Sequence, residues 1–281
     1  MEFEGQKNKF FSARERVLLK MSALPFQANE AINSLRGNIQ LSGFDIRVIG
    51  VTSALKHEGK SSLSFRLAKS FAALEKRTLY IDCDIRNSQT VSRYKIAKQC
   101  EGISEYLCGK TDLNSIIYAT QDSCLDLILT GAVAPNPSEL FSGDLFARML
   151  KTVRQEYDYV IVDTPPVNAV IDGVLIANRC DGSILVVESG VTERIQVQRA
   201  KQQLEFAGVK LLGVVLNKVG TRKSGYGYGY GYGYGYGYGY GYGYGYGYGY
   251  GEEKKTGKEK RKKTDKNAAS GRSGQDSQSE K

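Results

Sequence analysis

A single loop limits most strongly what this chain can fold into. The loop spans residues 54–61, follows the apolar run 46–52 and precedes the helical pattern of 61–74. It matches the P-loop pattern, with alanine in place of the first glycine. Gly59 lets the backbone approach a phosphate, and amides at the start of the helix would point at the anion. The chain therefore needs a buried strand and a helix that meet at a phosphate-binding turn.

Short apolar runs and helical patterns alternate through residues 45–224. The runs lack the polar alternation of half-exposed strands, so both faces of the sheet should be covered. Strands separated by helices favour a parallel sheet. We therefore predict an α/β fold with a mainly parallel sheet flanked by helices, and a ligand at the carboxyl ends of the strands. The expected strands are 46–52, 78–81, 125–130, 159–162, 183–187 and 211–216, and the expected helices are 27–40, 61–74, 138–155, 170–177 and 193–206.

Two carboxylates follow the second expected strand. Asp82 and Asp84 stand two residues apart, and Arg86 stands two residues further on. If the strand continues, both Asp side chains point the same way. Because burying two unpaired carboxylates side by side is costly, we expect a cation between them. Mg²⁺ fits this place, and Arg86 would help to neutralise phosphate.

A third acidic residue, Asp163, ends the apolar run 159–162 and precedes Thr164-Pro165-Pro166. The segment resembles a Walker B motif, whose Asp orients Mg²⁺ and its water. In the loop described above, Lys60 can reach the β- and γ-phosphates of a nucleotide, and the Ser61 hydroxyl can bind Mg²⁺. Three such elements at three strand ends predict one site for a nucleotide and Mg²⁺.

Residues 225–251 alternate strictly between glycine and tyrosine. Glycine at every second position disfavours a stable helix or packed strand, so we expect this segment to be disordered. The repeat carries tyrosines at every even position: Tyr226, Tyr228, Tyr230, Tyr232, Tyr234, Tyr236, Tyr238, Tyr240, Tyr242, Tyr244, Tyr246, Tyr248 and Tyr250. Taken alone, a repeat of this composition is also typical of segments that mediate assembly or condensation.

Much of the positive charge of the chain lies in its last segment. The formal net charge is +9, and residues 252–281 contain ten Lys or Arg against six Asp or Glu. A charge run of this kind is typical of a solvated, disordered tail, so we expect no nucleic-acid partner. The predicted organisation is an N-terminal segment with a helix (1–44), a P-loop domain (45–224), the Gly-Tyr repeat (225–251) and the charged tail (252–281).

Several signals predict a cytoplasmic protein. No apolar run reaches the length of a transmembrane helix, and the first residues lack a basic region followed by an apolar one. Five cysteines, none of them in a CxxC pattern, fit free thiols in a reducing compartment. Cys83, which stands between the two Asp residues, is expected to pack inward as a small apolar side chain.

The order of these motifs resembles that of a known family. Asp82-Cys-Asp-Ile-Arg86, between a P-loop and Asp163-Thr-Pro-Pro166, is similar to the Walker A′ motif of the bacterial tyrosine kinases (BY-kinases), which serve capsule and exopolysaccharide synthesis. The resemblance spans roughly residues 26–220 and includes Asn136-Pro-Ser-Glu-Leu140 and Gly213-Val-Val-Leu-Asn-Lys218. It implies a protein-tyrosine kinase that uses ATP and Mg²⁺ and phosphorylates its own C-terminal tyrosine cluster, mostly in trans.

The resemblance also implies a role for each site residue. ATP would be bound by Gly59, Lys60, Ser61 and Ser62, Mg²⁺ and its waters would be held by Ser61, Asp82, Asp84 and Asp163, and the catalytic set would be Lys60, Asp82, Asp84 and Arg86. Asp82 is the candidate base, which is needed because the pKa of a free tyrosine is about 10. The sequence leaves open which Asp plays which role. It also leaves open whether Asn217 contacts adenine or is a loop residue after a strand.

The resemblance implies partners as well. Kinases of this kind carry Glu-x-x-Arg-x-x-Arg in the N-terminal helix, linked to contacts in a ring of subunits. Here Glu30 and Arg36 fit, but Asn33 replaces the first arginine, so one charged contact of such a ring is missing. The activator would be a separate transmembrane polypeptide, a polysaccharide co-polymerase, whose cytoplasmic tail completes the ATP site and recruits the kinase to the inner face of the plasma membrane. A cognate tyrosine phosphatase is also implied.

Two other functions remain open from the sequence. ParA/MinD-type ATPases share the sheet, but they carry a signature lysine where this chain has Leu55. Such a switch would hydrolyse ATP without making phosphotyrosine. A non-enzymatic assembly protein built on the Gly-Tyr repeat would behave the same after Lys60→Met. The acidic set of Asp82, Asp84 and Asp163 argues against this second alternative.

Overall fold

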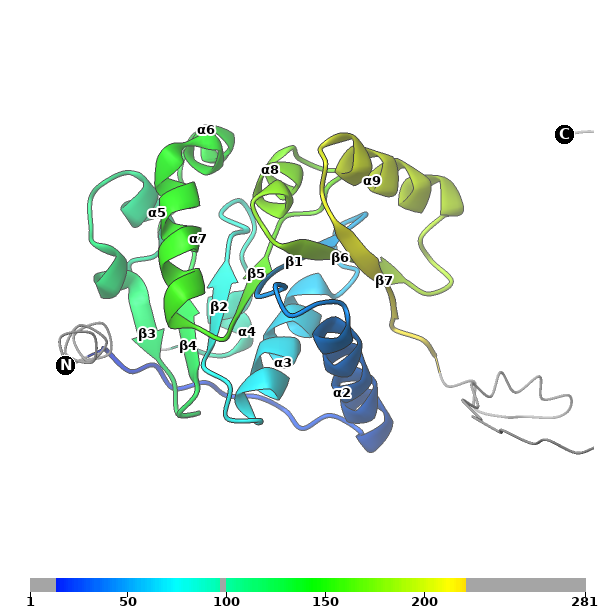
Figure 1. Cartoon of the computed structure of the whole chain (residues 1–281), viewed down its shortest axis with the longest axis horizontal. Helices are drawn as coiled ribbons and strands as arrows, with labels where there is room; N and C mark the ends of the chain where they lie inside the picture. Colours follow the sequence, from blue (N-terminus) through cyan, green and yellow to red (C-terminus); the bar gives the residue numbers. More distant parts are fainter. Residues whose placement is uncertain (1–13, 97–99, 221–281) are drawn as a thin grey trace, which may run out of the picture. The chain divides into compact units, whose positions relative to one another are not determined.

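The computed structural model describes residues 14–96 and 100–220, which belong to one unit, Met1–Lys223. In this part of the chain seven strands form one sheet, in the order β3-β4-β2-β5-β1-β6-β7 (Figure 1). Neighbouring strands are parallel, except that β3 and β4 are antiparallel. The strands are β1 (Val48–Ser53), β2 (Thr78–Asp82), β3 (Ile117–Ala119), β4 (Leu125–Ile128), β5 (Tyr159–Asp163), β6 (Gly182–Glu188) and β7 (Leu211–Asn217).

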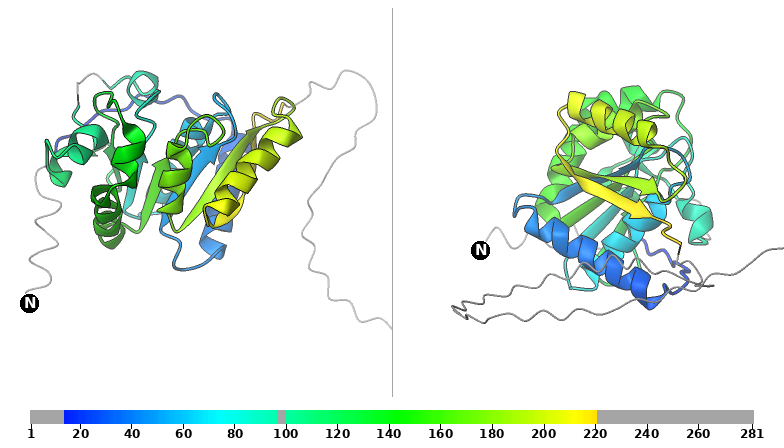
Figure 2. Two further views of the ribbon diagram at one scale, coloured as in Figure 1. Left: turned by 90° about the horizontal axis from the view of Figure 1, so that it is seen from above. Right: turned by 90° about the vertical axis from the view of Figure 1, so that its right-hand side faces the viewer.

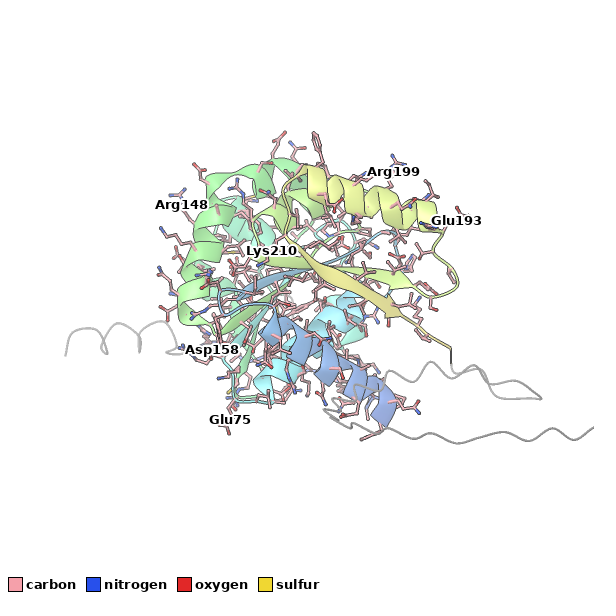
Figure 3. The ribbon with its side chains drawn as sticks, turned by 45° about the vertical axis from the view of Figure 1, so that its right-hand side comes forward. Glu75, Arg148, Asp158, Glu193, Arg199 and Lys210 are labelled. Carbon is pink, nitrogen blue, oxygen red and sulfur yellow. The ribbon has the colours of Figure 1, made fainter. Side chains whose placement is uncertain are left out.

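Helices cover both faces of this sheet. α2 and α3 lie on one face, and α6, α7, α8 and α9 lie on the other (Figures 1 and 2). Figure 3 shows charged side chains such as Arg148, Glu193 and Arg199 on the outer surface. The helices are α2 (Phe26–Leu41), α3 (Lys60–Ala72), α4 (Thr90–Arg93), α5 (Ile103–Leu107), α6 (Pro137–Ser142), α7 (Asp144–Glu156), α8 (Asp172–Asn178) and α9 (Arg194–Phe206), with a 3₁₀ turn, η1, at Leu113–Ile116.

The two faces of the sheet are filled by alternate residues of the same strands. On β2, Tyr80 packs in the core beneath α3, whereas Leu79 and Ile81 pack in the core beneath α7. Side chains alternate across a strand, so a strand covered on both faces must be apolar throughout. Every residue of β1 and β2 is buried, which confirms the prediction of a parallel sheet flanked by helices.

The fold differs from the sequence prediction in several parts, and the short helices α4 and α5 are among the elements that were not predicted. The predicted helix 138–155 is two helices, because the chain is extended at Gly143 (φ −72°, ψ 161°) between α6 and α7. The short edge strand β3 was not predicted. It pairs antiparallel with β4, and a strand of this length carries too little periodicity to be seen in a sequence.

An extended N-terminal segment runs along the bottom of the sheet to α2, as the dark blue ribbon in Figure 1 shows. The amide of Val17 donates to the carbonyl of Ala119 at 2.9 Å, and the amide of Ala119 donates to the carbonyl of Glu15 at 2.9 Å. The segment thus extends the β3 edge of the sheet with backbone hydrogen bonds. Further along, the amide of Lys20 donates to the carbonyl of Tyr94 at 2.9 Å, so the segment also contacts the turn after α4.

The described residues contain no helix that is long and apolar enough to cross a membrane. The Gly-Tyr repeat (225–251), the charged tail (252–281) and the predicted boundary at residue 224 lie outside the described residues, so the predictions made for them stay predictions.

Candidate active site

Strand ends bring the predicted motifs to one edge of the sheet. Asp82 at the end of β2 is in register with Asp163 at the end of β5, and Val51 of β1 is in register with the same Asp163. The loop after β1 therefore lies beside both carboxylates. Carboxyl ends of parallel strands meet in this way in any sheet of this type, which is why the ligand site was expected here.

The P-loop makes a tight turn before α3. His57 and Gly59 both have positive φ, at 67° and 91°. A side chain at Gly59 would also force the Asn217 side chain to move, because its Nδ2 lies 2.2 Å from where the Cβ would stand. The side chains of Lys56 and His57 are exposed, whereas Lys60 at the first position of α3 is buried. The loop therefore turns one lysine out to solvent and the other into the site.

The ammonium of Lys60 lies among three oxygen atoms. Its Nζ is 2.9 Å from Oδ2 of Asp84, 3.5 Å from Oδ1 of Asp163 and 3.2 Å from Oγ of Ser61. Burial lowers the pKa of Lys60, but the neighbouring carboxylates, Asp163 foremost, raise that pKa above its usual value. Burial raises the pKa of Asp163 to about 6, although the charge of Lys60 acts in the opposite direction. Lys60 is thus a charged side chain held by two buried carboxylates.

Asp82 has a different set of contacts. Its Oδ2 accepts hydrogen bonds from the hydroxyls of Ser88, at 2.6 Å, and Thr90, and its Oδ1 accepts one from the amide of Asp84 at 3.1 Å. The structure therefore differs from the expectation of a cation between Asp82 and Asp84. The cation is Lys60, and it lies between Asp84 and Asp163. β2 ends at Asp82, so the strand does not continue through Asp84. Oδ2 of Asp84 pairs with Lys60, whereas the oxygens of Asp82 accept from Ser88, Thr90 and the amide of Asp84.

Arg86 is fixed by a second acidic residue. Its Nε donates to Oδ2 of Asp172 at 2.6 Å, and Asp172, at the start of α8, is fully buried. Ser138 of α6 donates to the same carboxylate at 2.5 Å. The Arg86 side chain is still 42% exposed and lines the same cavity as the P-loop. This pairing gives Ser138, within the Asn136–Leu140 motif, a structural role at the edge of the site.

Asn217 and Lys218 hold the P-loop from the end of β7. The Asn217 amide donates to the carbonyl of Glu58 at 2.8 Å, and Nζ of Lys218 donates to the carbonyl of His57 at 2.6 Å. The sequence left open whether Asn217 contacts adenine or is a loop residue after a strand. Neither interpretation included the hydrogen bond from Asn217 to Glu58. The side chain of Asn217 positions the phosphate-binding loop.

Glu58 was missed in the sequence, although it lies within the P-loop. It is 2% exposed, and its carboxylate accepts hydrogen bonds from the amide of Leu55 at 2.7 Å and from the hydroxyl of Thr192. The amide of Glu188 is a third donor, at 3.4 Å. The buried carboxylate therefore ties the P-loop to the loop between β6 and α9. The signal in the sequence is an acidic residue inside a phosphate-binding loop. A buried carboxylate there needs hydrogen-bond donors of its own, so Glu58 should have been expected to bind other parts of the chain.

We expect Thr192→Val to loosen this loop without changing its shape. The substitution keeps the volume but removes one donor to a buried carboxylate, a change that costs about 1–3 kcal/mol. Thermal unfolding should show lower stability, and calorimetry should show weaker ATP binding. Thr152→Val is the matched control, since the Thr152 hydroxyl donates only to a carbonyl of its own helix on an exposed surface. Equal behaviour of the two variants would contradict the role given to Glu58.

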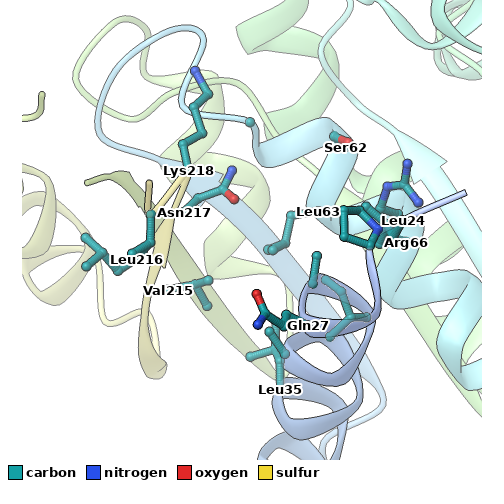
Figure 4. A pocket seen from close by; sticks show the side chains of 16 residues that line it. Leu24, Gln27, Leu35, Ser62, Leu63, Arg66, Val215, Leu216, Asn217 and Lys218 are labelled. Carbon is teal, nitrogen blue, oxygen red and sulfur yellow. The ribbon is translucent and has the colours of Figure 1, made fainter. Parts of the chain in front are cut away.

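Two adjoining cavities open at the P-loop. The first, of about 670 Å³, is lined by P-loop residues together with Asp84, Arg86 and Arg93. The second, of about 580 Å³, lies between α2, α3 and β7, and Figure 4 shows Leu35 of α2 and Val215 of β7 on its opposite walls. Gly59, Ser62, Asn217 and Lys218 line both. A cavity lined by charged side chains beside a mostly apolar one suits a molecule with a phosphate chain and a flat base.

Mg²⁺ fits the donors at this site. Within the described residues no group of three or more His, Cys, Asp or Glu side chains surrounds a single point. Mg²⁺ does not need such a cage, because it is usually held by one or two carboxylates together with phosphates and waters. Ser61, Asp84 and Asp163 already converge on one cationic group, the Lys60 ammonium. Asp82, the fourth predicted ligand, does not contact the Lys60 ammonium within hydrogen-bond distance; two hydroxyls donate to its Oδ2 and one amide donates to its Oδ1.

These features define a class of protein: an α/β nucleotide-binding protein with a P-loop and acidic residues at adjacent strand ends. The chain matches the family model described as an AAA domain over residues 46–190. It is 40% identical over 200 residues to the tyrosine-protein kinase CpsD of Streptococcus agalactiae serotype III, with 71% of this chain and 86% of that protein covered. The kinase domain of the Escherichia coli tyrosine kinase ETK has a similar structure, with a TM-score of 0.67, 34% identity, and 75% of this chain and 87% of that domain covered.

The chain therefore belongs to the bacterial tyrosine-protein kinases of the CpsD and ETK type, which confirms the resemblance found in the motifs. It is a protein-tyrosine kinase. The septum site-determining protein MinD of Pyrococcus horikoshii is also similar in structure, with a TM-score of 0.55, 20% identity, and 63% of this chain and 72% of that chain covered. At this identity the likeness to MinD shows a shared fold alone.

Proposed function

We propose that this kinase transfers the γ-phosphoryl group of ATP to the tyrosines of its own Gly-Tyr repeat, mostly in trans between copies. One observation carries the proposal: no tyrosine is exposed in the described part of the chain. Four are buried (Tyr80, Tyr94, Tyr118 and Tyr157) and two are partly buried (Tyr106 and Tyr159). The other thirteen of the nineteen tyrosines stand in residues 225–251. The repeat is therefore the part of the chain that can supply acceptors.

ATP would bind across the two cavities. The phosphates would lie on the P-loop amides near Lys60, and the base would lie in the apolar cavity against α2 and β7. Lys60 has to turn from Asp84 and Asp163 toward the β- and γ-phosphates, which frees these carboxylates for Mg²⁺ and its waters. Bound Mg²⁺ would neutralise charge on the transferring phosphoryl group. Arg86, held at the rim of the same cavity by Asp172, would add positive charge there.

Asp82 would accept the proton of the attacking tyrosine. Each carboxylate oxygen has about two lone-pair sites. Oδ2 already receives the hydroxyls of Ser88 and Thr90, whereas Oδ1 receives only the amide of Asp84. Oδ1 therefore keeps a site for the incoming proton. The three donors would hold the carboxylate in place while the tyrosine approaches.

The family membership supports the proposed partners. We propose that a transmembrane polysaccharide co-polymerase recruits the kinase to the inner face of the plasma membrane, that a tyrosine phosphatase reverses the reaction, and that the process controlled is polymerisation and export of a capsular polysaccharide or exopolysaccharide. Contacts between copies of the chain would involve α2. There Asn33 links Glu30, at 3.0 Å, to Arg36, at 3.2 Å, and Arg36 also donates to the carbonyl of Ser70 at 2.7 Å. Arg36 is thus partly used within its own subunit, which would weaken a ring of copies.

An anti-phosphotyrosine blot of the purified full chain tests this function. The protein is incubated with Mg²⁺ and ATP, with and without the cytoplasmic segment of the activator. We expect phosphotyrosine on the chain, and more of it when the activator segment is present. ATP hydrolysis without phosphotyrosine under any condition would contradict the proposal and favour an ATPase switch.

A further inference from the structure

Tyr80 places a buried hydroxyl group beside the active-site carboxylates. The side chain is 0% exposed at the centre of the sheet, on β2. Its hydroxyl donates to Oδ2 of Asp163 at 3.3 Å and lies 3.4 Å from Oγ1 of Thr90, which in turn donates to Asp82. The Tyr80 hydroxyl therefore contacts Asp163, a predicted ligand of Mg²⁺, and Thr90, which donates a hydrogen bond to the predicted base Asp82.

The contact fixes Asp163 from the side opposite to Lys60. Oδ1 of Asp163 faces the Lys60 ammonium, and Oδ2 faces the Tyr80 hydroxyl. If Lys60 turns toward the phosphates of a nucleotide and Ser61 turns toward Mg²⁺, Tyr80 remains as a donor that keeps the carboxylate plane in place. Burial, followed by the charge of Asp163, raises the pKa of Tyr80 well above its usual value, so the hydroxyl stays a neutral donor.

Packing alone does not require a hydroxyl at this position. The Tyr80 ring packs edge-on against Phe65 of α3, with centroids 5.1 Å apart, and phenylalanine would make the same contact. The hydroxyl must be removed from water to reach this place, which is unfavourable unless it finds a partner. The same aromatic group contains Tyr94, whose ring centroid is 4.1 Å from that of Phe65 and whose buried hydroxyl has no hydrogen-bond partner in the described structure.

We propose that Tyr80 is a positioning residue of the kinase, whose hydroxyl holds Asp163 in the orientation that receives Mg²⁺ together with the nucleotide. The inference rests on the proposed function of the site, in which Asp163 is a ligand of Mg²⁺ or of its waters. Partners that orient a metal ligand typically change metal affinity or activity by about 10- to 100-fold when they are removed. The effect should appear only when the metal is present.

Calorimetry of nucleotide binding to the full chain tests the proposal. ADP is titrated into wild type, Tyr80→Phe and Tyr94→Phe, each with Mg²⁺ and with a chelator. We expect Tyr80→Phe to weaken Mg²⁺-ADP binding by about 10-fold and to leave binding without Mg²⁺ unchanged. Tyr94→Phe should match wild type in both conditions. It removes a hydroxyl from the same cluster of aromatic rings, but this hydroxyl makes no hydrogen bond in the described structure.

A double substitution separates positioning from packing. In an Asp163→Asn background, Tyr80→Phe should cause no further loss of Mg²⁺-dependent affinity, because the carboxylate that it positions is gone. Thermal unfolding without ligand should show lower stability for Tyr80→Phe than for Tyr94→Phe, because only Tyr80→Phe removes a donor to a buried carboxylate. Equal weakening of ADP binding with and without Mg²⁺, or no weakening at all, would overturn the proposal.

The proposed function can fail independently of this inference. Wild type that binds Mg²⁺-ADP but makes no phosphotyrosine from ATP would contradict the kinase reaction on the repeat, while the binding comparison would still decide the role of Tyr80. In an active wild type, Tyr80→Phe should also raise the Mg²⁺ concentration needed for half-maximal phosphorylation, and excess Mg²⁺ should restore most of the rate.

Discussion

Lys60→Met should abolish phosphotyrosine formation. The ammonium is the buried cation that lies among Ser61, Asp84 and Asp163, and in the proposed reaction it turns to the phosphates of ATP. Removing one preorganised donor to a developing charge typically lowers the rate by about 100- to 1000-fold. A phosphotyrosine blot over a time course measures this loss. Lys110→Met, at an exposed position after α5, is the control that keeps full activity.

The same substitution has a second expected effect, on stability. It leaves the buried carboxylates of Asp84 and Asp163 without their cation, and breaking a buried ion pair costs about 3–5 kcal/mol. Chemical denaturation without nucleotide should show this loss, reduced to the extent that Asp163, whose pKa is already raised, takes up a proton. A Lys60→Met chain that forms phosphotyrosine at the wild-type rate would show that phosphoryl transfer does not depend on the P-loop lysine.

A chain that ends after Ser224 should lose almost all phosphorylation of itself but should keep its catalytic activity. The truncation removes the thirteen tyrosines of the repeat and leaves six, none of them exposed in the described structure. Mass spectrometry of the full chain should accordingly find phosphate on the repeat. Strong self-phosphorylation of the truncated chain would show that the acceptors lie elsewhere.

Mixing two variants tests transfer between copies. The truncated chain has the active site but no repeat, and the Lys60→Met chain has the repeat but no active site. Incubated together with Mg²⁺ and ATP, they should produce phosphotyrosine on the Lys60→Met chain. Each variant alone should produce almost none. If the mixture stays unmodified while the wild type phosphorylates itself, transfer within one chain is the correct description.

Local patterns in the sequence determined much of the fold and of the candidate site. The order of strands and helices, the P-loop before α3, and the acidic residues at the ends of β2 and β5 all follow from local patterns of apolar, glycine and acidic residues. The inward packing of Cys83 was predicted as well, and the residue is fully buried. Such features depend on residues a few positions apart, so the period and composition of a short segment reveal them.

Only the tertiary structure decided which side chains meet. Asp84 pairs with Lys60, Arg86 pairs with Asp172, and Tyr80 reaches Asp163, although each pair is separated by more than twenty residues or by a whole element. These contacts depend on the register of β2 against β5 and on where each strand ends. A sequence pattern predicts that a residue is buried or lies at a strand end. The direction in which its side chain then points is set by packing across the sheet, which is a property of the whole fold.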